Sequence, residues 1–112
     1  IEDTRSNLLS SAALENYVGN DMYAQFAETA RQEGFKRAAD TFDAIIVAEK
    51  HHEKLFLHLA ENIATQRIFH AEAPIRWRCL GCGYIHTGEN PPDKCPACVR
   101  PTGWFERLCE NY

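Results

Sequence analysis

The chain has 112 residues, which is enough for one modest domain or two very small ones. Its formal net charge of -4 and its lack of a basic stripe give no reason to expect nucleic acid or an anionic membrane as a partner. It contains no run of about eighteen apolar residues, and its first residues lack the basic and apolar regions of a signal peptide, so we expect it in the cytoplasm.

Apolar periodicity predicts a long first helix from Asp3 to about Gly34. Asp3 or Thr4 can cap its start, and Gly34 is a plausible left-handed residue just beyond its end. The residues expected on one face recur at spacings of three and four: Leu8, Ala12, Glu15, Val18, Met22, Phe26 and Thr29.

The pattern restarts at Phe35 and predicts a second helix that runs to about Thr65. Two helices of about thirty residues, joined by a tight turn, form an antiparallel hairpin about 45 Å long. Such a hairpin cannot cover its own apolar stripes, so we expect it to pair with another hairpin. The expected apolar face of the second helix carries Phe42, Ile45, Ile46, Glu49, His52, Phe56, Leu59 and Ile63.

The helical pattern fails from Arg67, and Pro74 bars further helix. We therefore expect a helical hairpin at residues 1–68, a linker at 69–75 and a small domain at 76–112. That small domain contains short strand-like runs at 75–78, 84–86 and 103–106, with prolines between them. Only a bound metal would hold so small a unit together.

Four cysteines of the small domain form two Cys-x-x-Cys pairs with twelve residues between them. This spacing predicts a tetrahedral four-sulfur site for one zinc or iron ion, and the spacing alone leaves the metal open. A structural disulfide pair or four unrelated thiols are the weaker alternative. A fifth cysteine, Cys109, is predicted to be a half-buried apolar residue. The four expected ligands are Cys79, Cys82, Cys95 and Cys98.

Glu49 and His52 lie one turn apart on the apolar face of the second helix, and Glu-x-x-His is one half of the di-metal signature of four-helix bundles. Glu15 lies on the apolar stripe of the first helix, where an unpaired charge is costly. It precedes Gly34 by nineteen residues and Glu49 follows by fifteen, so antiparallel packing brings the two to similar heights. Alone, Glu15 could be a salt-bridged residue and His52 a core histidine, but together the three predict a metal site.

These three residues are half of a site, because a bundle site takes one glutamate from each of two helices and Glu-x-x-His from each of the other two. Either a second copy of the chain or a different hairpin, such as a separate N-terminal half, must complete it. The chain begins at Ile1 and not at methionine, which is typical of a processed or partial polypeptide. Two further histidines, His51 and His58, are expected on the surface.

The whole chain resembles the C-terminal part of a rubrerythrin, from the third bundle helix through the rubredoxin-like domain. The resemblance implies a mainly α fold with a small β metal-binding module: an antiparallel hairpin forming half of a ferritin-like four-helix bundle, then a rubredoxin-like four-cysteine domain. The motifs that carry it are residues 11–15 (SAALE), 21–23 (DMY), 48–54 (AEKHHEK), 77–84 (WRCLGCGY) and 95–98 (CPAC).

By this resemblance, Glu15, Glu49 and His52 match di-iron ligands, and Tyr23 matches a tyrosine that lines the di-iron pocket. The four cysteines match the ligands of a mononuclear iron, which favours iron over zinc. The resemblance implies a peroxidase that reduces hydrogen peroxide to water at the di-iron site. Electrons would be relayed through the four-cysteine iron from an external donor such as a reductase or a rubredoxin.

One position departs from the family pattern. Many rubrerythrins carry a second glutamate three residues after the first, and that carboxylate is linked to a redox-dependent shift of one iron between glutamate and histidine. Here the position is Val18, which cannot ligate iron, and the remaining set looks more like the symmetric site of bacterioferritin. Ferroxidase activity or oxygen reduction is therefore an alternative. A non-enzymatic alternative is a helical dimerisation module with a structural zinc ribbon and carboxylates paired to arginines.

Overall fold

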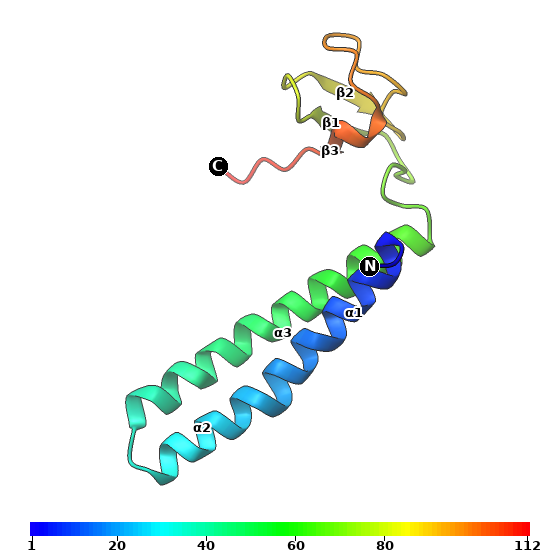
Figure 1. The fold of residues 1–112 in the computed structure, drawn as a ribbon. Helices are drawn as coiled ribbons and strands as arrows, with labels where there is room; N and C mark the ends of the chain where they lie inside the picture. The colour runs from blue at the N-terminus through cyan, green and yellow to red at the C-terminus, as the bar shows by residue number, and fades with distance from the viewer. The chain divides into compact units, whose positions relative to one another are not determined.

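The computed structural model describes residues 1–112 and divides them into two compact units, Ile1–Ala64 and Thr65–Tyr112. The first unit is an antiparallel helical hairpin and the second is a small sheet with long loops (Figure 1). The domain limits proposed from the sequence stay a prediction. None of the helices combines the length and the apolar character needed to cross a membrane.

The first arm of the hairpin is not one uniform α-helix. It consists of α1 (Thr4–Tyr17), a single π-helical turn η1 (Val18–Met22) and α2 (Tyr23–Gln32), and it packs against α3 (Lys36–Ala64). The apolar periodicity predicted both long helical arms but not the π-helical turn. A π-turn adds one residue without ending the helix. In this chain the residues of the stripe still recur at spacings of three and four through the turn, so the apolar pattern does not reveal it.

Both ends of the first arm follow the capping chemistry expected from the sequence. The Asp3 carboxylate accepts a hydrogen bond from the Ser6 backbone N–H at 3.0 Å, so Asp3 and not Thr4 is the N-cap. Gly34 has a φ of +83°, and the N–H of Phe35 donates to the carbonyl of Ala30 at 2.8 Å. This is a Schellman turn, in which glycine is favoured because it has no Cβ atom to oppose a positive φ.

Inside the hairpin, only small residues are fully buried, and many large apolar side chains stay exposed. Small residues at these positions allow the two arms to approach closely. A salt bridge between Arg31 and Asp43 also joins the arms near the turn. Two helices alone therefore cannot cover their bulky side chains. The buried residues are Ala12, Gly19, Ala27, Ala30, Ala39 and Ala60, and the exposed ones include Leu14, Tyr17, Phe26, Phe35, Val47 and Leu55.

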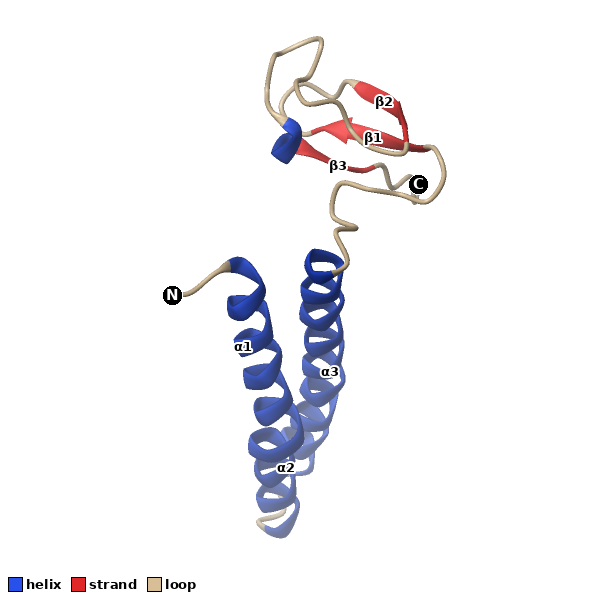
Figure 2. Ribbon diagram, turned by 90° about the vertical axis from the view of Figure 1, so that its right-hand side faces the viewer, coloured by secondary structure: helices blue, strands red, loops and turns tan.

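The second unit is built on a three-stranded antiparallel sheet in the order β2-β1-β3, formed by β1 (Ile75–Cys79), β2 (Ile85–Gly88) and β3 (Phe105–Arg107) (Figure 2). The third predicted strand begins too early, because Thr102–Trp104 is a short 3₁₀ turn. The Trp104 N–H closes that turn on the carbonyl of Pro101 at 2.9 Å, so pairing with β1 starts only afterwards.

The core of this unit is small and contains two of the cysteines. Trp77 is completely buried, and its indole N–H donates to the carbonyl of Gly88 at 2.9 Å. The prediction for Cys109 is wrong, because this residue is exposed beyond the end of the sheet. The core residues are Ala71, Trp77, Cys79, Cys95 and Phe105, with Ile75, Tyr84 and Cys98 packed against them.

Candidate metal centres

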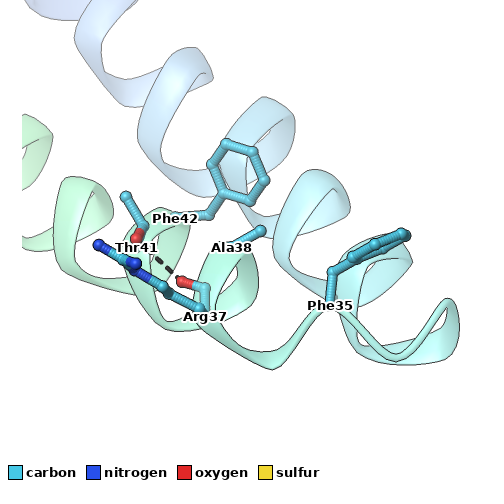
Figure 3. Close-up of a pocket in the computed structure, with 5 residues that line it drawn as sticks. All are labelled: Phe35, Arg37, Ala38, Thr41 and Phe42. Carbon is cyan, nitrogen blue, oxygen red and sulfur yellow. Dashed lines mark hydrogen bonds between the residues drawn. The ribbon is translucent and has the colours of Figure 1, made fainter.

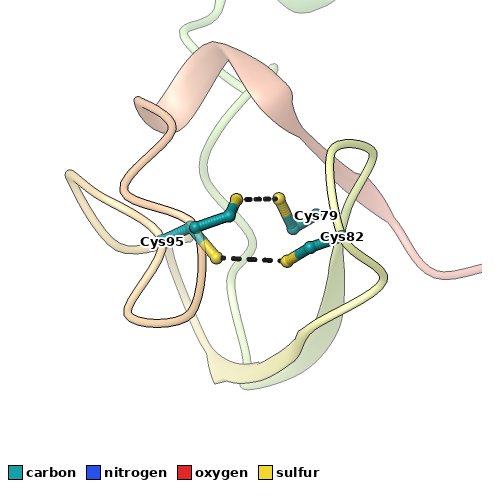
Figure 4. Close-up of side chains that lie close together, drawn as sticks. Cys79, Cys82 and Cys95 are labelled. Atoms are coloured by element: carbon teal, nitrogen blue, oxygen red, sulfur yellow. Dashed lines mark hydrogen bonds between the residues drawn. The ribbon is translucent and has the colours of Figure 1, made fainter.

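The four predicted cysteines converge in the second unit, and their sulfur atoms all lie within 4.8 Å of one another. The Sγ atoms of Cys79 and Cys98 are 3.6 Å apart, and those of Cys82 and Cys95 are 3.7 Å apart (Figure 4). A tetrahedron with metal–sulfur bonds of about 2.3 Å has edges of about 3.8 Å. The geometry therefore fits a four-sulfur metal site, and the disulfide alternative is wrong because all the cysteines are free.

The two Cys-x-x-Cys pairs repeat one backbone turn. In the first, the N–H of Gly83 donates to the carbonyl of Cys79 at 2.8 Å, and in the second the N–H of Val99 donates to the carbonyl of Cys95 at 2.9 Å. The residue after each pair has a positive φ, +82° at Gly83 and +55° at Val99. A β-branched residue at such a φ is strained, whereas glycine is not.

Hydrogen bonds and burial shift the thiol pKa values of Cys95 and Cys82 in opposite directions. Burial alone would raise the pKa of Cys95, but the backbone N–H groups of Cys98 and Ala97 lower it to about 7. The Tyr84 N–H lowers the pKa of Cys82, but desolvation and the other thiols outweigh it and raise the pKa to about 12. Of these two thiols, Cys95 therefore loses its proton more readily, and a bound metal would displace the proton of Cys82 as well.

The second cluster lies in the hairpin, where Glu15 of α1 meets Glu49 and His52 of α3. One ligand atom from each residue lies within 4.8 Å of the others. His52 Nδ1 is 3.0 Å from Glu49 Oε2 and 3.8 Å from Glu15 Oε2. The antiparallel packing therefore brings together the three residues selected from the sequence, and the donor set suits iron. Their role as ligands stays a prediction.

The two carboxylates of the cluster have pKa values shifted in opposite directions. The hydrogen bond with Glu49, followed by burial, raises the pKa of Glu15. The same hydrogen bond, followed by one from His52, lowers the pKa of Glu49. Two carboxylates held this close repel one another when both are charged, and a bound cation would offset that repulsion.

Gly19 explains how Glu49 can approach the first arm. Gly19 lies in the π-helical turn and is buried, and an added Cβ atom there would lie only 3.1 Å from the Cβ atom of Glu49. Sequence reasoning missed this residue. The glycine itself was a usable signal. A glycine inside a helix lowers helix stability by about 1 kcal/mol relative to alanine, so its presence there points to close packing.

Tyr23 begins α2, directly after the π-helical turn. Its ring packs against Phe26 and Phe42, with centroids 5.9 and 5.8 Å away, and its hydroxyl makes no hydrogen bond to the glutamates. Its predicted place in a di-iron pocket stays untested. The surface histidines His51 and His58 are exposed, as expected.

An open depression lies beside the hairpin turn (Figure 3). Phe35, Ala38 and Phe42 give it an apolar lining, and the hydroxyl of Thr41 is used locally, donating to the carbonyl of Arg37 at 2.9 Å. Because it gathers no group of acids, bases or metal ligands, it is not a candidate site for chemistry.

Two family profiles match the two units of the chain. The profile described as "Rubrerythrin" matches residues 1–60, more than half of the sequence. The chain belongs to the rubrerythrin family. A second profile, "Rubrerythrin, rubredoxin-like domain", matches residues 77–106. The predicted resemblance and fold class are confirmed. The rubrerythrin family has a di-iron centre and a rubredoxin-like four-cysteine iron site, and the two clusters of this chain offer the corresponding kinds of donor.

Curated rubrerythrins match over essentially the whole chain. The sequence is 46% identical over 112 residues to the rubrerythrin of Nitratidesulfovibrio vulgaris, covering 100% of this chain and 59% of that protein. It is 41% identical over 110 residues to the putative rubrerythrin of Methanocaldococcus jannaschii, covering 98% of this chain and 54% of that protein. The chain thus spans little more than half the length of these relatives.

Solved structures of nigerythrin share the fold. One, described as the partially reduced state of nigerythrin, matches with a TM-score of 0.55 and 32% identity, covering 96% of this chain and 51% of that chain. Another, described as its fully reduced, all-ferrous state, has a TM-score of 0.54 and 33% identity, covering 96% and 50%. The fold of this chain therefore recurs in experimental structures.

Proposed function

We propose that this rubrerythrin-family chain forms part of an oxidoreductase that reduces hydrogen peroxide to water. The observation that carries the proposal is the presence of two different donor clusters in one chain. Glu15, Glu49 and His52 offer oxygen and nitrogen donors, and the four cysteines offer sulfur donors. The first set suits iron that reacts with an oxygen species, and the second suits one-electron transfer.

In this proposal, Glu15, Glu49 and His52 hold half of a di-iron centre. When bound, the iron pair would supply the two electrons that turn one hydrogen peroxide and two protons into two waters, and the four-cysteine iron would return electrons singly. An external protein, such as a reductase or a rubredoxin, would donate the electrons.

The hairpin needs a second hairpin to complete the carboxylate site. Its exposed bulky side chains and its incomplete donor set both support this requirement. The partner is either another copy of the chain or a different polypeptide. The intact mass of the native assembly, combined with iron and zinc counts, distinguishes these cases, because a second subunit of different mass would exclude the purely self-paired form.

The main test is the substitution Glu49→Ala in the iron-loaded assembly. We expect peroxide reduction to be lost while the visible absorption of the cysteine-bound iron persists. Glu53→Ala is the matched control, because Glu53 lies one turn further along α3 and pairs with Asn16 at 2.9 Å, outside the cluster. An unchanged peroxide rate in Glu49→Ala would refute the proposal.

Val18 supports a second candidate function, ferroxidase activity or oxygen reduction at a symmetric site. This residue stands half-buried in the π-helical turn and cannot supply a carboxylate. Rates of reoxidation of the reduced protein by oxygen and by peroxide separate the two functions. A purely structural zinc module would instead contain one zinc per chain and no iron.

A further inference from the structure

The side chain of Arg100 lies against Gly81, inside the first Cys-x-x-Cys pair. A Cβ atom built on Gly81 would lie 2.3 Å from Cδ and 2.5 Å from Nε of Arg100. Gly81 stands between Cys79 and Cys82, so the arginine occupies the space that any side chain at residue 81 would fill. The φ of Gly81 is not positive, and its lack of a side chain therefore serves this contact and not the backbone turn.

Arg100 is held at both ends. Its carbonyl accepts a hydrogen bond from the N–H of Cys95 at 2.8 Å, which ties its backbone to the second pair. Its guanidinium carbon lies 3.8 Å from the centre of the Trp104 ring, a cation–π contact. The carbonyl of Trp104 in turn accepts from the N–H of Leu80 at 2.8 Å, which fixes the tryptophan beside the first pair.

The charge of Arg100 is not neutralised by a carboxylate. Arg76 pairs with Glu110 and Arg78 pairs with Glu106 in the same unit, whereas no ion pair involves Arg100. A positive charge without an ion-pair partner therefore lies beside the turn that carries Cys79 and Cys82.

We propose that the positive charge of Arg100 raises the reduction potential of the cysteine-bound iron. The inference rests on the proposed assignment of the four cysteines as iron ligands. Four thiolates and ferric iron carry a net charge of -1, and one electron from a donor makes it -2. A nearby cation stabilises the -2 state more than the -1 state, so it favours reduction.

The test is a mediated redox titration of the full, iron-loaded chain at low salt, followed by the visible absorption of the ferric four-sulfur site. In Arg100→Gln we expect the ratio of ferrous to ferric iron at a fixed ambient potential to fall severalfold. A tenfold fall corresponds to about 59 mV for a one-electron couple. Arg100→Lys keeps the charge and should restore most of the ratio. Arg76→Gln changes the net charge equally but removes a paired arginine, so it should have a smaller effect.

A double-mutant cycle tests the contact itself. Gly81→Ala is compatible with the backbone but displaces the Arg100 side chain, so it should also lower the ratio. In an Arg100→Ala background, Gly81→Ala should have no further effect, because no long side chain remains to be displaced.

The outcomes separate this inference from the proposed function. If the wild-type chain forms no coloured four-sulfur iron site, the ligand assignment fails, and the inference fails with it. If the site forms but Arg100→Gln and Arg76→Gln shift the potential equally, only the role of Arg100 is refuted. Equal effects of Gly81→Ala with and without Arg100 refute it as well.

Discussion

Gly19 and Glu49 touch across the hairpin, since an added Cβ atom on Gly19 would lie 3.1 Å from the Cβ atom of Glu49. This contact joins the π-helical turn of the first arm to a proposed iron ligand of the second. A π-turn next to a metal-binding residue agrees with the frequent occurrence of such turns at functional sites. We therefore expect the turn to position Glu49, and substitution of Gly19 tests this.

Gly19→Ala should push Glu49 away by a few tenths of an ångström and weaken iron binding at the carboxylate cluster. Helicity should not fall, because alanine favours helix over glycine by about 1 kcal/mol. Iron counts per chain, measured alongside the absorption of the four-cysteine site, check the prediction. Gly103→Ala is the control, since an added Cβ atom there meets nothing within 4 Å. Full iron loading of Gly19→Ala would contradict it.

Glu15→Gln should stabilise the metal-free protein at neutral pH and abolish iron binding at the carboxylate cluster. The pKa of Glu15 is raised in the folded state, so folding favours its protonated form, and this stabilisation is lost as the pH rises through the folded pKa. Glutamine imitates the protonated form at every pH. Urea unfolding of the metal-free variant should show a small increase in midpoint at neutral pH and none in acid. A lower midpoint at neutral pH would contradict the raised pKa of Glu15.

Val18→Glu should shift reactivity from oxygen towards peroxide. The substitution returns a carboxylate to the π-helical turn, at the position where many rubrerythrins carry a second glutamate. Stopped-flow reoxidation of the reduced protein gives the ratio of the peroxide rate to the oxygen rate. Val18→Gln, similar in size but without charge, controls for bulk, and an equal ratio in both variants would argue against a carboxylate effect.

The sequence was sufficient for the parts of this protein that depend on spacing. The two helical arms, the turn at Gly34 and both donor clusters follow from periodicity and from the distances between cysteines, glutamates and the histidine. Contacts between side chains far apart in sequence were not predictable in this way. The approach of Gly19 to Glu49 and of Arg100 to Gly81 depends on how backbones pack, and a spacing pattern carries no such information.

Local irregularities were also missed, and for a similar reason. The π-helical turn at Val18–Met22 preserves the helical direction, so the apolar stripe continues through it. The 3₁₀ turn at Thr102–Trp104 contains an aromatic residue typical of strands, which extended the predicted strand into it. Cys109 was misjudged because nothing in the sequence marks where sheet pairing ends.

Asp3→Ala should destabilise the hairpin at neutral pH but not in strong acid. The hydrogen bonds from the backbone and the side chain of Ser6 lower the pKa of Asp3 in the folded state. A lowered pKa contributes stability above the unfolded value, and this contribution is lost as the pH falls through the folded pKa. Helical circular dichroism during urea unfolding should thus separate the variant from the wild type at neutral pH, with the difference shrinking in acid. Asp3→Asn keeps an acceptor oxygen and should lie between the two.

The strained φ of Val99 makes the second Cys-x-x-Cys turn easier to open than the first. Opening the turn at Cys95–Val99 relieves a strain of about 1–3 kcal/mol, whereas opening the matching turn at Gly83 relieves none. Local opening events should therefore begin at the second pair, and the Val99 amide should exchange its hydrogen faster than the Gly83 amide. Metal loss would then proceed in a fixed order, in which Cys79 and Cys82 of the first pair release the metal last.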